Sequence, residues 1–189
     1  MNMQTLVKED ADLFYEMWRV LLHQANLKWK MYPDINYSTD EQIDVSKTVK
    51  LAKKIWENKE VIDECLSAHP ELPERQRQIM NSWKKAVHGN FIIERHLQSG
   101  SIFIMDGGEV YRVLGIISSY EEIFWMHGLP VYVEATILPF EGKLITDGLM
   151  NMRNIFFGPG IRKSFKEQYS NAKREKRIIT SFPEDEDEA

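Results

Sequence analysis

The spacing of apolar residues divides the chain near residue 89. Before that point, apolar side chains recur every three or four positions, which is typical of helices that bury one face. Gly89 stands where a glycine commonly ends a helix. The pattern predicts helices from Leu6 to Met31, from about Asp44 to Asn58, from Glu60 to Ala68 and from Glu74 to Val87. Four helices with short links predict a small bundle or an array of helical hairpins.

From Asn90 onward, the pattern changes to short apolar or alternating runs separated by glycine-containing turns. Strands are expected over residues 91–94, 101–105, 110–115, 131–138 and 143–146. Asp106-Gly107-Gly108 and Glu141-Gly142 are signals for the tight turns of antiparallel hairpins. Residues 120–125 are expected to form one helical turn or an ordered loop, and residues 178–180 a final strand.

These elements predict an α+β protein: an N-terminal helical bundle followed by a small bent antiparallel sheet or SH3-like barrel with a C-terminal helix. The helical region covers residues 1–89, and the β-rich region covers residues 90–182, with its helix at about 161–176. Residues 183–189 are expected to be an acidic disordered tail. With 43% hydrophobic residues among 189, the chain can bury a core in either one domain or two. Trp18, Trp29 and Trp56 are expected to lie in the core or between the two regions.

The formal net charge of −5 comes from Glu184-Asp185-Glu186-Asp187-Glu188, so residues 1–183 are neutral overall. Residues 162–177 contain seven Lys or Arg and two Glu, a local charge of +5. The single cysteine, Cys65, excludes an intramolecular disulfide and is typical of a reducing compartment. We expect no secretion signal, because no cationic segment followed by an apolar one stands at residues 1–5, and no apolar run approaches the ~18 residues that span a bilayer. We therefore expect a cytoplasmic protein without a membrane partner.

The strongest local signal for a binding site is Gly158-Pro159-Gly160, which leads into Ile161-Arg162-Lys163-Ser164. A helix N-terminus offers unpaired N–H groups and a partial positive charge, and glycines let an anion approach the backbone. Gly158, Gly160, Arg162, Lys163 and Ser164 are therefore candidate anion-binding residues. The spacing is not that of a Walker A loop, and a simple strand-to-helix turn explains the same glycines.

The basic helix from Arg162 to Arg177 suggests phosphate contacts with nucleic acid, and aromatic residues would add stacking surfaces for bases. The candidates for stacking are Tyr111, Tyr132, Phe156 and Tyr169. The neutral balance of residues 1–183 argues against a broad positive field, and basic residues on an amphipathic helix commonly form its solvated face.

For an enzyme, the candidate pocket carboxylates are Glu94 and Glu134, both in predicted strands. Glu134 shares a strand face with Tyr132 and Thr136, and a cavity on that face would make it a general acid or base. A glutamate on a half-exposed sheet is the simpler interpretation. Cys65 and His69 are too few for a zinc site. No metal and no cofactor are expected, and no catalytic residue is identified.

The run LPFEGKLITDGL, from Leu138 to Leu149, and the run NIFFGPGIRKSF, from Asn154 to Phe165, resemble a segment of uncharacterised bacterial proteins. The resemblance covers roughly residues 91–181 and implies a bacterial source, with no activity attached.

The residues thus favour a non-enzymatic binding or adaptor protein with an anion contact at the Gly158–Ser164 turn. Its partner is unidentified, and a protein or an anionic ligand is expected. Nucleic-acid association through the basic helix is the first alternative, and a small-molecule enzyme that uses Glu134 is the second. The sequence leaves the choice between binding and catalysis open.

Overall fold

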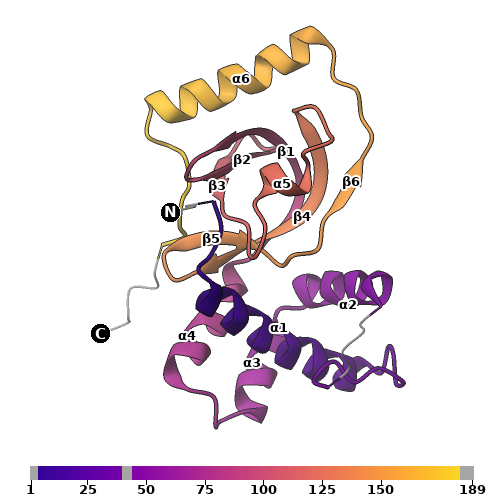
Figure 1. Ribbon diagram of the computed structural model, residues 1–189. Helices are drawn as coiled ribbons and strands as arrows, with labels where there is room; N and C mark the ends of the chain where they lie inside the picture. The colour runs from indigo at the N-terminus through magenta and orange to yellow at the C-terminus, as the bar shows by residue number, and fades with distance from the viewer. Residues whose placement is uncertain (1–3, 40–43, 184–189) are drawn as a thin grey trace. The chain divides into compact units, whose positions relative to one another are not determined.

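The computed structural model describes residues 4–39 and 44–183 and confirms the α+β class (Figure 1). Two compact units share the chain. Residues 7–86 form a helical unit, while residues 4–6 and 87–183 belong to a β-rich unit. The helical unit is therefore inserted into the β unit close to the start of the chain. The predicted acidic tail lies, apart from Pro183, outside the described residues.

The helical unit consists of α1 (Lys8–Trp29), α2 (Val45–Glu57), α3 (Glu60–Ala68), α4 (Glu74–Ser82) and a 3-10 turn, η1 (Trp83–Lys85). Its core is aromatic: the Trp18 and Trp56 rings are stacked with centroids 5.4 Å apart, and Trp83 meets Trp18 edge-on. Trp18 and Trp56 are thus core residues, as expected. Trp29 is half-buried, with Lys54 over its ring. Burial of such large rings is the main stabilising contribution to a unit of this size.

The β unit contains a curled, antiparallel half-barrel with strand order β3-β2-β1-β4-β5, in which β6 also pairs with β4. The strands are β1 (Val87–Leu97), β2 (Gly100–Met105), β3 (Val110–Val113), β4 (Val131–Phe140), β5 (Lys143–Thr146) and β6 (Asn151–Arg153). The Leu114 N–H donates to Leu144 O at 2.8 Å, so the curl brings the end of β3 to β5. The turns at residues 106–108 and 141–142 fall where the sequence predicts them.

Both ends of the described chain join this sheet. Thr5 bridges Gly115 in parallel, and Ile179 bridges Tyr111. Ile179 therefore extends the sheet beside β3, in the segment where the sequence predicts a final strand. The short helix α5 (Tyr120–Ile123) confirms the helical turn expected there.

Two apolar layers lie on opposite faces of the sheet. The inner face of the curl holds Phe91, Phe103, Tyr120 and the odd-numbered residues of β4 from Val131 to Ile137. The outer face holds Ile92, Ile102, Ile104 and Val110, which α6 (Pro159–Arg174) covers with Tyr169 and Ala172 (Figure 1). The C-terminal helix thus fixes the position of the turn that precedes it.

Gly89 does not cap a helix. Helix α4 ends at Ser82, and β1 begins at Val87 because Val87, His88 and Gly89 pair with Ile137, Thr136 and Ala135 of β4. A Cβ atom at Gly89 would lie 2.9 Å from Met105 Cε, so the glycine leaves space for that side chain.

Candidate functional site

The Gly158–Ser164 turn is the start of α6, with Gly158 as the N-cap residue and Pro159 in the first helical position. Pro159 is suited to that position because the N–H group it lacks would have no intrahelical acceptor. The turn is exposed to solvent along its whole length. The sequence prediction of a helix start at these residues is therefore confirmed, and anion binding there stays a prediction.

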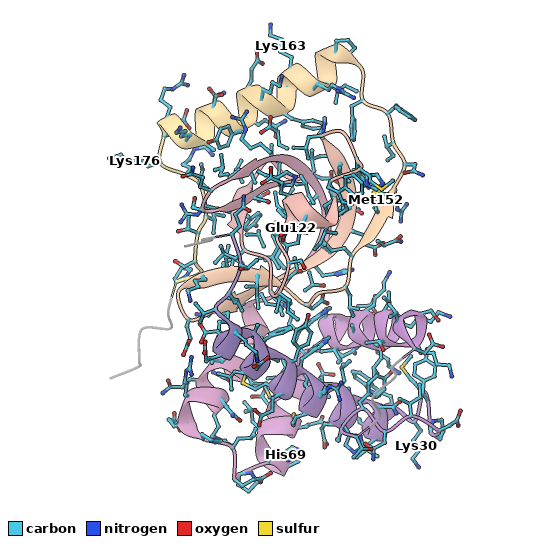
Figure 2. All side chains as sticks on the ribbon, in the orientation of Figure 1. Lys30, His69, Glu122, Met152, Lys163 and Lys176 are labelled. Atoms are coloured by element: carbon cyan, nitrogen blue, oxygen red, sulfur yellow. The ribbon has the colours of Figure 1, made fainter. Side chains whose placement is uncertain are left out.

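The three side chains proposed to complete an anion site have different partners. Arg162 Nε donates to Phe157 O at 3.0 Å, and its Nη1 lies 3.5 Å from Leu129 O. Lys163 Nζ lies 3.7 Å from the Glu167 carboxylate, and Ser164 Oγ accepts a hydrogen bond from Gln168. Arg162 therefore ties the loop before β4 to the turn, while Lys163 remains exposed and extends from α6 away from the sheet (Figure 2).

The basic residues of α6 and the segment after it form an exposed stripe. Lys163, Lys166, Lys173, Arg174 and Arg177 are all exposed. Within residues 4–39 and 44–183, Lys166 and Lys173 have no acidic partner. Of the aromatic residues proposed for base stacking, however, Tyr111 and Tyr169 are buried in the core. Those two rings cannot stack on bases, because their faces already contact protein.

Glu94 lies in a β-bulge of β1, where residues 94 and 95 together oppose the single residue Ile102 of β2. Its side chain is 4% exposed, and its carboxylate accepts hydrogen bonds from Arg95 Nε and, at 3.1 Å, from Arg95 Nη2. The Arg95 guanidinium lies over the Tyr169 ring of α6, 4.0 Å from its centroid. The hydrogen bonds with Glu94 raise the pKa of Arg95. Glu94 thus has a structural role, because it holds the cation that contacts α6.

Glu134 lies on the outer face of β4, between Asn90 of β1 and Asn151 of β6. Its carboxylate oxygens lie 3.5 Å from His88 Nε2 and 3.5 Å from an Arg153 nitrogen. The other His88 ring nitrogen lies 2.9 Å from Thr136 Oγ1. The Glu134 carboxylate thus belongs to a half-buried polar cluster on the sheet surface.

The two candidate carboxylates do not converge. Glu134 opposes Asn90, and Glu94 is four residues further along β1, a separation of about 13 Å at the usual rise of a strand. In the part of the chain that the structure describes, no group of three or more His, Cys, Asp or Glu side chains is arranged to hold a metal ion. No described helix is long and apolar enough to span a bilayer.

His96 is a polar residue that the sequence did not single out. Its Nδ1 lies 2.7 Å from Ser101 Oγ across the β1–β2 pair. Burial lowers the pKa of His96, and the charge of Glu121 partly opposes that shift. The imidazole is therefore held neutral at physiological pH, as is typical of a structural histidine.

The β unit exposes apolar side chains on two loops, residues 124–130 and 154–158, and at the adjoining ends of α5 and α6. Phe156 is 97% exposed, Trp125 78% and Met126 73%, and Ile123, Ile155 and Ile161 are exposed as well. The contacts of Arg162 with Phe157 O and Leu129 O bring the loop before β4 and the loop before α6 together. We call these six apolar residues, with Arg162, Lys163 and Lys166, the aromatic–basic surface.

A sequence signal for this surface exists, but it is weak. Residues 123–130 and 148–166 contain no Asp or Glu, whereas the second segment carries four cations. The sequence pattern indicates Phe156 as a stacking candidate and assigns no binding role to Trp125 or Met126. Aromatic residues are usually buried, so nothing in their local pattern indicates exposure.

Comparison with known proteins gives no further lead: no protein-family model, no curated protein and no solved structure matches the chain.

Proposed function

We propose that the protein is a non-enzymatic binding or adaptor protein whose β unit contacts its partner through the aromatic–basic surface. The observation that supports this proposal most directly is the near-complete exposure of Phe156 beside the basic turn that starts α6. We also propose a cytoplasmic location and a relationship to the uncharacterised bacterial proteins that share the 138–165 segments.

The energetics favour association. Burial of one large apolar side chain contributes about 1.5–3 kcal/mol. Monomeric proteins seldom expose several such side chains together unless the patch takes part in binding. Phe156, Trp125 and Met126 therefore provide enough apolar area for a specific contact. The neighbouring cations add long-range attraction to a partner of negative charge.

Catalysis is less well supported than binding. Glu94 is engaged by Arg95, and Glu134 is engaged by His88 and Arg153 at a separate point of the outer face. A general acid–base pair needs both groups within hydrogen-bond reach of one substrate. The arrangement of these two carboxylates does not meet that requirement.

The test is site-specific photo-crosslinking in cells of the source organism. A photoreactive phenylalanine analogue replaces Phe156 in one variant and Ile117 in a matched control, because Ile117 is also apolar and 69% exposed but lies beside the Thr5–Gly115 bridge. We expect a discrete crosslinked product from position 156 and none from position 117. No product at 156, or the same products at both positions, would refute the proposed surface.

Nucleic-acid association is a second candidate function, because Lys163, Lys166, Lys173, Arg174 and Arg177 form an exposed stripe along and just beyond α6. It predicts binding to single-stranded nucleic acid that weakens steeply with salt, with a logarithmic slope of roughly −0.7 per phosphate contact. Replacement of Lys166 and Lys173 together by Ala should reduce that slope. An intact chain that leaves labelled RNA and DNA unshifted at low salt would eliminate this candidate.

A further inference from the structure

We infer that the aromatic–basic surface binds the interfacial region of a membrane that contains anionic lipids. The inference specifies the partner of the proposed binding function and depends on it. It concerns peripheral attachment, in which side chains enter the headgroup region and no helix crosses the bilayer.

The exposure of the apolar side chains limits what can cover them. A side chain that lines a groove is partly shielded by the groove walls, yet Phe156 is 97% exposed and Trp125 78%. These rings therefore protrude, and a partner must enclose them from outside. A lipid interface can do so without a matching pocket, because its molecules rearrange around an inserted side chain.

The base of the protruding loop is held in place. Phe157, next to Phe156, packs edge-on against Phe165 of α6 with ring centroids 5.3 Å apart. Arg162 donates to the Phe157 carbonyl at 3.0 Å. Phe156 is thus presented on an ordered support, which lowers the conformational entropy lost on insertion.

Charge supports an anionic lipid surface. The acid-free segments 123–130 and 148–166 contribute Arg162, Lys163 and Lys166, while their other cation, Arg153, lies 3.5 Å from the Glu134 carboxylate. Three acidic residues directly flank these segments. Glu122 is engaged with Ser119 in a capping box, Asp147 is buried and accepts a hydrogen bond from the Leu149 N–H, and Glu167 lies near Lys163. Interfacial attachment typically combines Trp or Phe with neighbouring Lys or Arg, and this surface has that composition.

Nucleic acid fits this end of the unit less well. Phosphate and bases give no role to exposed Met126, Ile155 and Ile161, whereas an acyl boundary does. Nucleic acid would also engage the far end of the basic stripe at Lys173. That residue is ten positions from Lys163, about 15 Å along the helix axis. Lys173 is therefore a useful discriminating position.

The experiment measures cosedimentation of the intact chain with vesicles of phosphatidylcholine alone and of phosphatidylcholine mixed with phosphatidylglycerol. We expect binding only to the mixed vesicles. Phe156→Ala should weaken it roughly tenfold, since the lost burial corresponds to about one decade in affinity. Lys163→Ala and Lys166→Ala should each weaken it about fivefold. The controls Ile117→Ala and Lys173→Ala should bind as the unaltered chain does.

The outcomes separate lipid from the other partners. No sedimentation of the intact chain with the mixed vesicles at low salt would overturn the lipid assignment. Unchanged binding of Phe156→Ala would overturn insertion, and a loss in Lys173→Ala equal to that in Lys163→Ala would indicate the basic stripe instead. A crosslink from position 156 to a protein, with no vesicle binding, would retain the proposed binding function and reject the membrane as its partner.

Discussion

The Glu94–Arg95–Tyr169 arrangement predicts an asymmetry between two substitutions. Arg95→Met removes the only cation that the structure places on the buried Glu94 carboxylate among the described residues, together with the contact to Tyr169 of α6. Glu94→Gln keeps an acceptor oxygen near the guanidinium and removes the charge. Since Arg95 is 35% exposed, water can solvate it when its partner is neutral. We therefore expect Arg95→Met to be the more damaging change.

The magnitudes follow from burial. Removal of one member of a fully buried ion pair costs about 3–5 kcal/mol, and access of water to Arg95 reduces this to roughly 2–3 kcal/mol. The lost cation–π contact adds about 0.5–1 kcal/mol. Glu94→Gln should cost about 1 kcal/mol, because a charge-assisted hydrogen bond becomes a neutral one. The double variant should lose less stability than the two single variants lose in sum, since a neutral amide at position 94 is destabilised less than a carboxylate when the guanidinium is absent.

Hydrogen exchange in a urea series, read by mass spectrometry, gives the free energy of opening separately for each segment. Peptides from residues 87–105 and 159–174 should lose protection in Arg95→Met, while peptides from α1 should not. Tryptophan fluorescence alone is unsuitable, because four of the five Trp residues belong to the helical unit. Equal costs for the two single variants, or strictly additive costs in the double variant, would refute the coupling.

Three further predictions concern other sites. Burial raises the pKa of Cys65 to about 12. A thiol reagent at about pH 8 should therefore modify the folded chain negligibly and should react once urea unfolds α3. Rapid reaction of the folded chain would contradict the burial of Cys65. The folded-state pKa of His96 is depressed, so the stability that the neutral imidazole contributes is present above about pH 6.5 and is lost as pH falls below that value. In urea titrations, His96→Gln should therefore lose less stability on acidification than the unaltered chain. An equal loss in both would exclude His96 as the group responsible. Truncation after Pro183 removes five acidic residues and should strengthen binding to anionic vesicles at low salt, with little change at high salt; weaker binding of the truncated chain would contradict this electrostatic account.

Much of the fold can be predicted from local patterns. The buried stripe of α1, the turns at residues 106–108 and 141–142, and the start of α6 after Gly158 all depend on neighbouring residues, which the sequence displays directly. The alternation in β4 also places Glu134 on one face with Tyr132 and Thr136, and the residues between and beside them lie inward: Val131, Val133, Ala135 and Ile137.

The errors arise where distant residues decide the conformation. Helix-forming residues run up to Val87, yet pairing with Ile137, Thr136 and Ala135 of β4 draws residues 87–89 into a strand. Residues 4–6 belong to the β unit through the bridge of Thr5 to Gly115, a contact across more than a hundred positions. No local pattern specifies such pairings, and the bulge at Glu94 likewise depends on β2.

The candidate surface was missed for a related reason. A membrane-spanning helix requires one continuous apolar run, and because the sequence contains none, it predicts no membrane partner. Trp125 and Phe156 are 31 positions apart, and the contact that links their loops is that of Arg162 with the Leu129 carbonyl. A surface assembled from two loops produces no run in the sequence.

The central claim is that the Phe156 side chain enters the partner. The direct test attaches an environment-sensitive dye to Phe156→Cys and, as a control, to Ile117→Cys. The buried Cys65 does not compete for the label, since its thiol is protonated at the labelling pH. We predict a blue shift of the dye at position 156, and none at position 117, on addition of phosphatidylglycerol-containing vesicles. An unshifted spectrum at position 156, or equal shifts at both positions, would contradict the claim.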